Sequence, residues 1–189
     1  MSQPVGILLA AGCSQRFGAD KRWHPMADGT PMVLASARHL AGICTQTVVV
    51  IRPGDDDLAV LLNRADLRHI VCHQAHLGMG HSLAAAITAT PNRWGWLVAL
   101  ADMPFIESGS YQVVLSALAQ GALIARPVIE GQVGHPVGFA AQLQHELVNL
   151  QGDRGGAAII ERHRAALHLC PVNDSGILKD IDLMTDLEN

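Results

Sequence analysis

VGILLAAGCSQRFGADK, at residues 5–21, joins an apolar run to a loop of small and basic residues. The run from Val5 to Ala10 predicts a short buried strand. Beyond it, Ala11, Gly12 and Ser14 would let backbone N–H groups approach an anion without obstruction by large side chains. In an open α/β sheet, ligands bind beyond the carboxyl ends of the strands, where this loop would lie. The stretch therefore predicts an α/β sheet with an anion-binding edge.

Two cations in the same loop support this interpretation. Arg16 carries a guanidinium that can bridge two oxygens, and Lys21 carries a compact ammonium. The alternative is a turn of small residues needed only for packing, with solvated basic side chains beyond it. The loop has neither the GxGxxG pattern of dinucleotide-binding folds nor the GxxxxGK[ST] pattern of P-loops. These two motifs are therefore excluded, whereas anion binding by the backbone is not.

Apolar segments of strand length alternate with helical segments up to residue 128. The predicted strands are 5–10, 47–52, 69–73, 96–101 and 123–128, and the predicted helices lie near 31–41, 55–65, 80–90 and 108–119. VVVI at 48–51 and WLVALA at 96–101 are continuously apolar, which is typical of strands covered on both faces. The alternation predicts a mostly parallel sheet flanked by helices, with right-handed crossovers.

The pattern changes after Val128. Residues 129–141 (IEGQVGHPVGFAA) predict a turn and a short strand, followed by a helix near 141–150 and a glycine-rich segment at 152–156. Two more short strands are expected near 167–171 and 176–181, before a terminal helix. No repeat or linker interrupts the chain, so a single domain over residues 1–189 is predicted.

Composition and charge exclude several classes of protein. Of the 189 residues, 49% are hydrophobic and 16% charged, and the formal net charge of −4 argues against a nucleic-acid partner. The cysteines (Cys13, Cys44, Cys72 and Cys170) form no CxxC pair, so neither a zinc ribbon nor a disulfide framework is indicated, and Cys13 is best explained as a small apolar filler of the loop. The start, MSQPVGILLAAG, has no basic segment typical of a signal peptide, and its apolar run is too short to span a membrane. We therefore expect a cytoplasmic protein with reduced thiols.

Carboxylates near two predicted strands offer ligands for a metal ion. Asp102 directly follows the most hydrophobic strand, so its side chain should emerge beside the first loop. Mg²⁺ commonly binds one or two carboxylates together with substrate phosphates. Asp180 or Asp182 could supply the second carboxylate, since alternation puts both on one face of an extended strand. The alternative for each aspartate is a helix cap.

A glycine-rich segment, GMGHSL at 78–83, lies between the third strand and an alanine-rich helix. Gly80 would allow close approach of a ligand, and the Ser82 hydroxyl can both donate and accept hydrogen bonds. The alternative for Ser82 is an ordinary helix N-cap. His69, His73 and His76 nearby could suggest a zinc site, but their spacing does not put three rings on one helical face and no thiolate is paired with them.

Taken together, these motifs resemble a known family. LAAG-x-S-x-R-F-G-x-x-K is similar to the signature of the nucleotidyltransferases that activate sugars, alcohols and pterins with NTPs, and more closely to the molybdenum cofactor cytidylyltransferases. Four further stretches agree in order: GMGHSL at 78–83, ADMPFI at 101–106, GHPVGF at 134–139 and KDIDLMTDL at 179–187. GHPVGF followed by GDRGG at 152–156 favours the molybdopterin branch. The resemblance implies a Rossmann-like, glycosyltransferase-A-like nucleotidyltransferase fold.

The resemblance also implies a reaction: transfer of CMP from CTP to the terminal phosphate of molybdopterin, with Mg²⁺ as cofactor and pyrophosphate as product. The phosphate contacts would come from the backbone of Leu9, Ala10, Ala11 and Gly12, from Arg16 at the β- and γ-phosphates, and from Lys21 at the α-phosphate. Asp102 and Asp182 would hold Mg²⁺, and Gly80 and Ser82 would contact the base and ribose. Residues 125–175 would form the acceptor-binding part, with Arg126, His135 and Asp153 as contacts. Ala11 favours CTP, because the guanylyl-transferring branch has glycine there.

Some positions depart from the family pattern. Arg22 and Trp23 replace two leucines, Ala84 replaces an arginine, and Leu183 and Met184 replace Thr-Pro. Two other functions are also considered: the same chemistry on a sugar or polyol phosphate, and a non-catalytic module that carries a finished pterin cofactor to a molybdoenzyme. A dehydrogenase is disfavoured because the dinucleotide fingerprint is absent. Neither a nucleic acid nor a membrane is expected as a partner.

Overall fold

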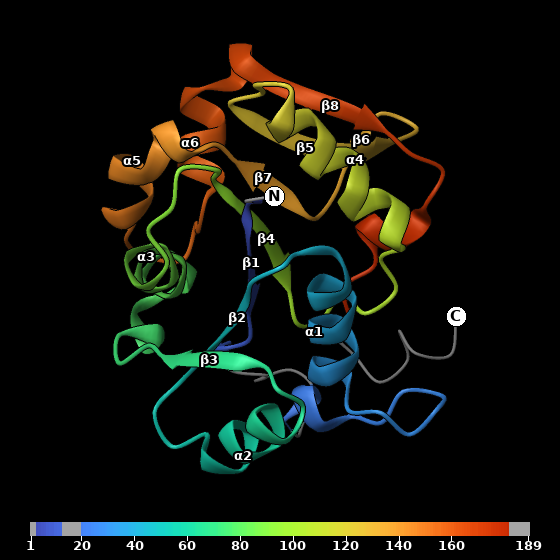
Figure 1. Cartoon of the computed structure of the whole chain (residues 1–189), viewed down its shortest axis with the longest axis vertical. Helices are drawn as coiled ribbons and strands as arrows, with labels where there is room; N and C mark the ends of the chain where they lie inside the picture. Colours follow the sequence, from blue (N-terminus) through green and yellow to red (C-terminus); the bar gives the residue numbers. More distant parts are fainter. Residues whose placement is uncertain (1–2, 13–19, 182–189) are drawn as a thin grey trace.

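The computed structural model describes residues 3–12 and 20–181 and shows a twisted sheet between two layers of helices (Figure 1). Strands β1 (Val5–Leu9), β2 (Thr47–Ile51), β3 (Arg68–Val71) and β4 (Trp96–Leu100) are parallel and lie in the order β3-β2-β1-β4. β2 is buried along its whole length, which confirms the prediction from its continuously apolar sequence. The carboxyl ends of β1 and β4 lie side by side, since Leu9 pairs with Leu100.

The sheet is mostly parallel, as predicted, and becomes mixed in the second half of the chain. Strand β7 (Val137–Phe139) lies antiparallel between β4 and β5 (Ile124–Ile129), and β8 (Leu167–Pro171) runs parallel to β5. A two-residue turn joins β5 to the short β6 (Gln132–Val133). Its residues Glu130 and Gly131 have φ values of 49° and 79°, the left-handed conformation that tight hairpins of this kind require.

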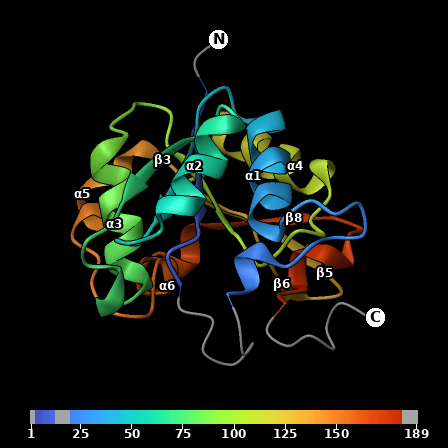
Figure 2. The same cartoon turned by 90° about the horizontal axis from the view of Figure 1, so that it is seen from below.

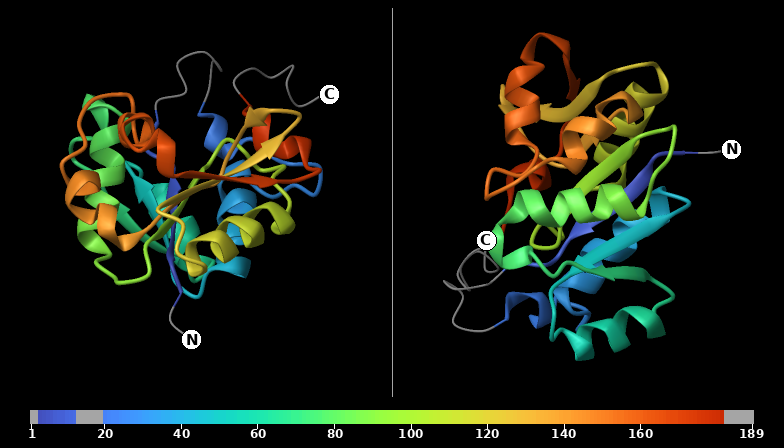
Figure 3. Two further views of the ribbon diagram at one scale, coloured as in Figure 1. Left: turned by 90° about the horizontal axis from the view of Figure 1, so that it is seen from above. Right: turned by 90° about the vertical axis from the view of Figure 1, so that its left-hand side faces the viewer.

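Helices cover both faces of the sheet (Figures 2 and 3). On one face, α1 (Met32–Ile43), α2 (Asp56–Arg64) and α4 (Ser108–Ala119) bury apolar side chains against the strands. On the other face, α3 (Met79–Ala89), α5 (Gln144–Val148) and α6 (Ala157–Arg162) do the same. The helices predicted between residues 31 and 150 are confirmed. The one near 141–150 consists of a 3₁₀ turn (η3, Ala141–Leu143) followed by α5. Within the described residues, no helix has the length and apolar character needed to cross a membrane.

The strand predicted near 176–181 is wrong. Ser175–Leu178 is a 3₁₀ helix (η5), because the Asp174 carboxylate accepts a hydrogen bond from the Gly176 N–H at 2.8 Å and so caps a turn. The same carboxylate accepts from the Ser110 hydroxyl at 2.6 Å, which fixes this turn to the start of α4. Local capping therefore overrides the extended conformation that the apolar residues suggested. The predicted terminal helix lies outside the described residues.

Two glycines at the start of α3 allow two distant segments to meet. The Gly80 N–H donates to Gly152 O at 2.7 Å, and the backbone of Gln151 and Gly152 packs directly on Gly78 and Gly80. Gly78 has a φ of 120°, and a Cβ atom added there would lie 2.4 Å from both Gly152 C and Asp153 Oδ1. A side chain at Gly78 would therefore push away the 151–153 loop.

We predict that Gly78→Ala destabilises the protein more than Gly54→Ala does. Both glycines have positive φ, so alanine costs roughly 1–2 kcal/mol of backbone strain at either site. An added Cβ has open space at Gly54 but overlaps backbone at Gly78, which adds roughly 1–3 kcal/mol. The free energy of unfolding of both variants in urea measures the difference, and equal losses would contradict this account of the contact between Gly78 and the 151–153 loop.

Candidate active site

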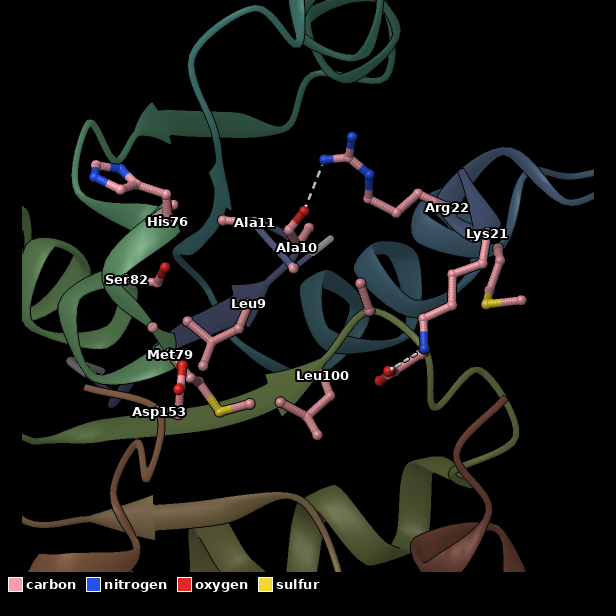
Figure 4. A pocket seen from close by; sticks show the side chains of 16 residues that line it. Leu9, Ala10, Ala11, Lys21, Arg22, His76, Met79, Ser82, Leu100 and Asp153 are labelled. Carbon is pink, nitrogen blue, oxygen red and sulfur yellow. Dashed lines mark hydrogen bonds and ion pairs between the residues drawn. The ribbon is translucent and has the colours of Figure 1, made fainter. Parts of the chain in front are cut away.

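A cavity of about 520 Å³ opens where β1 and β4 end (Figure 4). Its walls come from the loop after β1, the segment before and within α3, the end of β4, and the 151–153 loop. The lining residues are Leu9, Ala10, Ala11, Gly12, Lys21, Arg22, Met32, Ala75, His76, Gly78, Met79, Ser82, Leu100, Ala101, Asp102 and Asp153. The structure thus brings together the predicted loop, Lys21, Ser82 and Asp102 in one cavity. Arg16 and Asp182 lie outside the described residues.

The loop after β1 presents its backbone to this cavity. The Ala10 N–H continues the sheet by donating to Val50 O at 3.0 Å. Over residues 3–12 and 20–181, no backbone carbonyl accepts a hydrogen bond from the N–H of Ala11 or Gly12. N–H groups in this position are suited to binding an anion.

Lys21 and Asp102 form an ion pair next to the carboxyl ends of β1 and β4. Lys21 begins the 3₁₀ helix η1 (Lys21–Trp23), and its Nζ donates to Asp102 Oδ2 at 2.8 Å and to Ile181 O at 2.9 Å. The Ile181 N–H in turn donates to Asp102 O at 2.9 Å. Loop, strand end and C-terminal segment are therefore linked at one point.

The two carboxylate oxygens of Asp102 differ in their surroundings. Asp102 Oδ1 is buried and has no hydrogen-bond partner within the described part of the chain. Such an oxygen fits a hard cation, which takes carboxylate ligands. Asp180, the other candidate ligand, is exposed. Asp182 directly follows Ile181 in sequence but is itself not described, so the metal pair remains a prediction.

Ser82 and Gly80 have different environments. Ser82 is buried and lines the cavity, and its alternative role as a helix N-cap is wrong because α3 begins at Met79 with Gly78 in the cap position. Gly80 does not line the cavity but packs against Gln151 and Gly152. Its close contact is thus with another loop of the protein, and its predicted contact with base and ribose remains untested.

The three predicted acceptor residues do not form one group. Asp153 lies in the cavity wall near Met79 and Ser82 (Figure 4), whereas Arg126 and His135 are not among the residues lining that cavity. Arg126 Nε donates to Gly134 O at 3.1 Å, and burial lowers the pKa of its guanidinium. Arg126 and Asp102 both act electrostatically on His135, so these three side chains lie near one another.

His135 is held neutral. Burial, together with the charge of Arg126, lowers the pKa of His135 to about 4, although Asp102 opposes the shift. Its Nδ1 is buried and has no hydrogen-bond partner within the described residues. At neutral pH the ring is therefore an uncharged hydrogen-bonding group and not a cation.

The pKa of His135 predicts how stability depends on pH. The folded pKa lies below the unfolded value, so the unfolded chain binds the proton more readily and stability falls as the pH drops from about 6.5 towards 4. We expect His135→Gln to reduce the loss of unfolding free energy between pH 7 and pH 5 by roughly 1–2 kcal/mol. Urea denaturation at both pH values measures this, with His39→Gln on the exposed face of α1 as the control. An unchanged loss in His135→Gln would refute the assignment.

Four charged residues next to the loop after β1 were not among the predicted site residues. Asp20, Arg22, Arg52 and Asp55 form a connected group of ion pairs, with Arg22 buried at its centre. The one signal in the sequence was a charged residue at position 22, where the resembled family has leucine. A local pattern cannot reveal the group, because Asp20 and Asp55 are far apart in the chain.

Comparison with known proteins establishes the family. Residues 6–167 match the model of the MobA-like NTP transferase domain. The chain belongs to this family. It is therefore a nucleotidyltransferase domain, and its mixed, mostly parallel sheet is shared with solved structures such as a nucleotidyl transferase from Methanothermobacter (TM-score 0.80).

Individual relatives are distant from this chain. The bifunctional protein GlmU of Xanthomonas euvesicatoria pv. vesicatoria (strain 85-10) is 31% identical over 144 residues, which cover 73% of this chain but 30% of GlmU. The chain thus corresponds to about 30% of the length of that relative. The purine catabolism protein PucB of Bacillus subtilis (strain 168) is 26% identical over 189 residues, covering 94% of this chain and 91% of PucB. Among solved structures, Rv0371c of Mycobacterium tuberculosis H37Rv superposes with a TM-score of 0.86 at 23% identity, covering 99% and 96% of the two chains.

Proposed function

We propose that this protein transfers CMP from CTP to the terminal phosphate of molybdopterin and releases pyrophosphate. The observation that carries the proposal is the Lys21–Asp102 pair where β1 and β4 end. Within the described residues, the N–H groups of Ala11 and Gly12 beside it have no backbone acceptor and Asp102 Oδ1 has no hydrogen-bond partner. Membership of the MobA-like NTP transferase family supports transfer of a nucleotide. A protein of this fold from Archaeoglobus fulgidus is named molybdopterin-guanine dinucleotide biosynthesis protein A, which supports a pterin acceptor.

The proposed reaction requires mainly positioning and positive charge from the protein. A terminal phosphate has a second pKa near 6, so the attacking oxygen is mostly ionised at neutral pH and no general base is required. In the proposed step, this oxygen forms a bond to the α-phosphorus of CTP while the bond from that phosphorus to the bridging oxygen of pyrophosphate breaks. The barrier arises from bringing anions together, so positioning and positive charge dominate catalysis.

Lys21 would change partner as the substrate binds. In the free protein its ammonium offsets the charge of Asp102. With CTP bound, Lys21 would contact the α-phosphate, and the N–H groups of Ala11 and Gly12 would contact the triphosphate. Arg16 would hold the β- and γ-phosphates.

The residues around Asp102 fit a divalent cation, with Asp182 as the proposed second ligand. Mg²⁺ would supply charge stabilisation to the phosphate oxygens when bound. A manganese complex of Rv0371c supports a divalent cation in this fold.

The proposed contacts for the base and for the acceptor lie partly side by side in this cavity. Ser82, in the cavity wall with Ala11, is the proposed contact for the base of CTP, and the Ala11 methyl group narrows the space that a purine would need. Arg126 would attract the acceptor phosphate, and neutral His135 would donate or accept a hydrogen bond. Asp153 lines the cavity near Ser82, so its proposed contact with the pterin requires the acceptor to reach that wall.

A pyrophosphate-release assay tests the reaction and the acceptor together. We expect release with CTP and Mg²⁺ only when molybdopterin is present, and little release with GTP. Release with a sugar phosphate or polyol phosphate in place of molybdopterin would favour the alternative acceptor, to which the similarity to GlmU points. No release with any NTP, combined with binding of the finished pterin cofactor, would favour the non-catalytic carrier.

Two substitutions test the Lys21–Asp102 pair. Lys21→Ala and Asp102→Asn should each lower the turnover rate by roughly 10²–10³, because each removes an electrostatic contact made at the reacting phosphates. Arg68→Ala on the edge strand β3 and Asp57→Asn on α2 are matched controls with exposed side chains away from the cavity. Turnover near the wild-type rate in either active-site variant would remove that residue from the mechanism.

A further inference from the structure

Arg22, Arg52, Asp20 and Asp55 form a closed charge cluster directly behind the phosphate loop. The Arg22 side chain is 4% exposed and uses all five of its N–H donors. Its Nε and Nη2 donate to Asp20 at 2.8 and 2.5 Å, and its Nη1 and Nη2 donate to Asp55 at 2.6 and 2.7 Å. The fifth bond, from Nη1 at 2.8 Å, goes to the backbone carbonyl of Ala10.

Arg52 extends the cluster to a second carbonyl of the loop, that of Gly12. Its Nη1 donates to Gly12 O at 3.3 Å, while its Nη2 and Nε donate to Asp20 at 3.0 Å and to Asp55 at 3.1 Å. Guanidinium groups therefore bind the carbonyl oxygens of Ala10 and Gly12, the residues before and after Ala11. With two positive and two negative side chains, the cluster has no net charge.

The bond to Ala10 O determines where the N–H of Ala11 points. A trans peptide is planar, and its C=O and N–H point in opposite directions. Since the Ala10 carbonyl points to Arg22 (Figure 4), the Ala11 N–H points away from the cluster. The same peptide group would otherwise be able to turn its carbonyl oxygen, an electron-rich atom, towards the bound triphosphate.

The cluster also orients Lys21. The Asp20 carboxylate accepts a hydrogen bond from the Arg22 N–H at 3.2 Å and so caps η1. Asp20 and Arg22 point into the cluster, whereas Lys21 between them points to Asp102. One turn of helix therefore ties the ammonium of Lys21 to the cluster.

We propose that this cluster is a brace that positions the phosphate loop, holding the Ala11 N–H and the Lys21 ammonium ready for the triphosphate. Arg22 and Arg52 are thus positioning residues and not phosphate ligands, because carboxylates and loop carbonyls already occupy them. The inference rests on the proposed function, in that the ligand of the loop is taken to be a nucleoside triphosphate.

Substitution of Arg52 shows whether this residue positions the loop or only attracts the triphosphate by its positive charge. Arg52 is 27% exposed, so Arg52→Gln and Arg52→Lys should both fold. A lysine keeps the charge but lacks the planar fork that reaches Asp20, Asp55 and Gly12 at once. We expect both variants to raise the KM for CTP about tenfold with kcat changed less than threefold, the size expected for loss of one charge-assisted contact. Faster amide hydrogen exchange at residues 10–12 should accompany the change.

Arg22→Lys tests the contact between the buried arginine of the cluster and the Ala10 carbonyl. Because Arg22 orients both the loop and Lys21, this variant should raise KM and also lower kcat, by about tenfold or more each. The thermal midpoint shows whether it folds, and if it does not, the Arg52 variants decide. Arg162→Gln, which removes an exposed ion pair with Glu146 outside the cavity lining, is the matched control and should leave KM, kcat and hydrogen exchange unchanged.

The outcomes distinguish the brace from the proposed function. If wild-type protein neither binds CTP with Mg²⁺ in calorimetry nor releases pyrophosphate, the proposed function fails. If the wild type binds CTP and Arg52→Lys binds it equally tightly, charge alone suffices and the brace is refuted. Unchanged hydrogen exchange at residues 10–12 in Arg52→Gln would refute it as well.

Discussion

The ion pair between Lys21 and Asp102 is the contact on which the arrangement of the site depends. It joins the loop after β1 to the end of β4, and Lys21 also binds Ile181 O, so three segments far apart in sequence meet at one ammonium group. The parallel pairing of β1 with β4 makes this contact possible, because it brings both carboxyl ends to the same edge of the sheet. Without that pairing, the loop after β1 and Asp102 would not lie in the same site.

Charge around the cavity is divided between two groups with different tasks. Behind the loop, two arginines and two aspartates neutralise one another and bind the carbonyls of Ala10 and Gly12. Burial makes the carboxyl groups harder to ionise, but the bonds and charges of the arginines prevail and lower the pKa of Asp20 and Asp55 below the usual value. Beside the loop, Lys21 and Asp102 neutralise each other, and in the proposed reaction they would instead contact an anion and a cation.

Local sequence patterns were reliable where a segment's conformation depends on its own residues. The continuously apolar runs 48–51 and 96–101 are buried strands, and the alternation of strands and helices gives the mostly parallel sheet. The prediction failed at 176–181, where the Asp174 carboxylate caps a turn and connects it to α4. It also did not foresee that Gly80 serves the approach of the 151–152 backbone. Both depend on partners distant in the chain.

The class of fold and a loop suited to an anion follow from the sequence alone, because they depend on local periodicity and on small side chains. The roles of lysine and aspartate towards phosphate and metal are proposed from the chemistry of these side chains. Only the tertiary structure decided which of these residues meet. It paired Lys21 with Asp102, brought Asp153 beside Ser82 and buried Arg22 among two aspartates. The physical reason is that burial and ion pairing depend on distances across the sheet, and those distances are established only when strands and helices pack together.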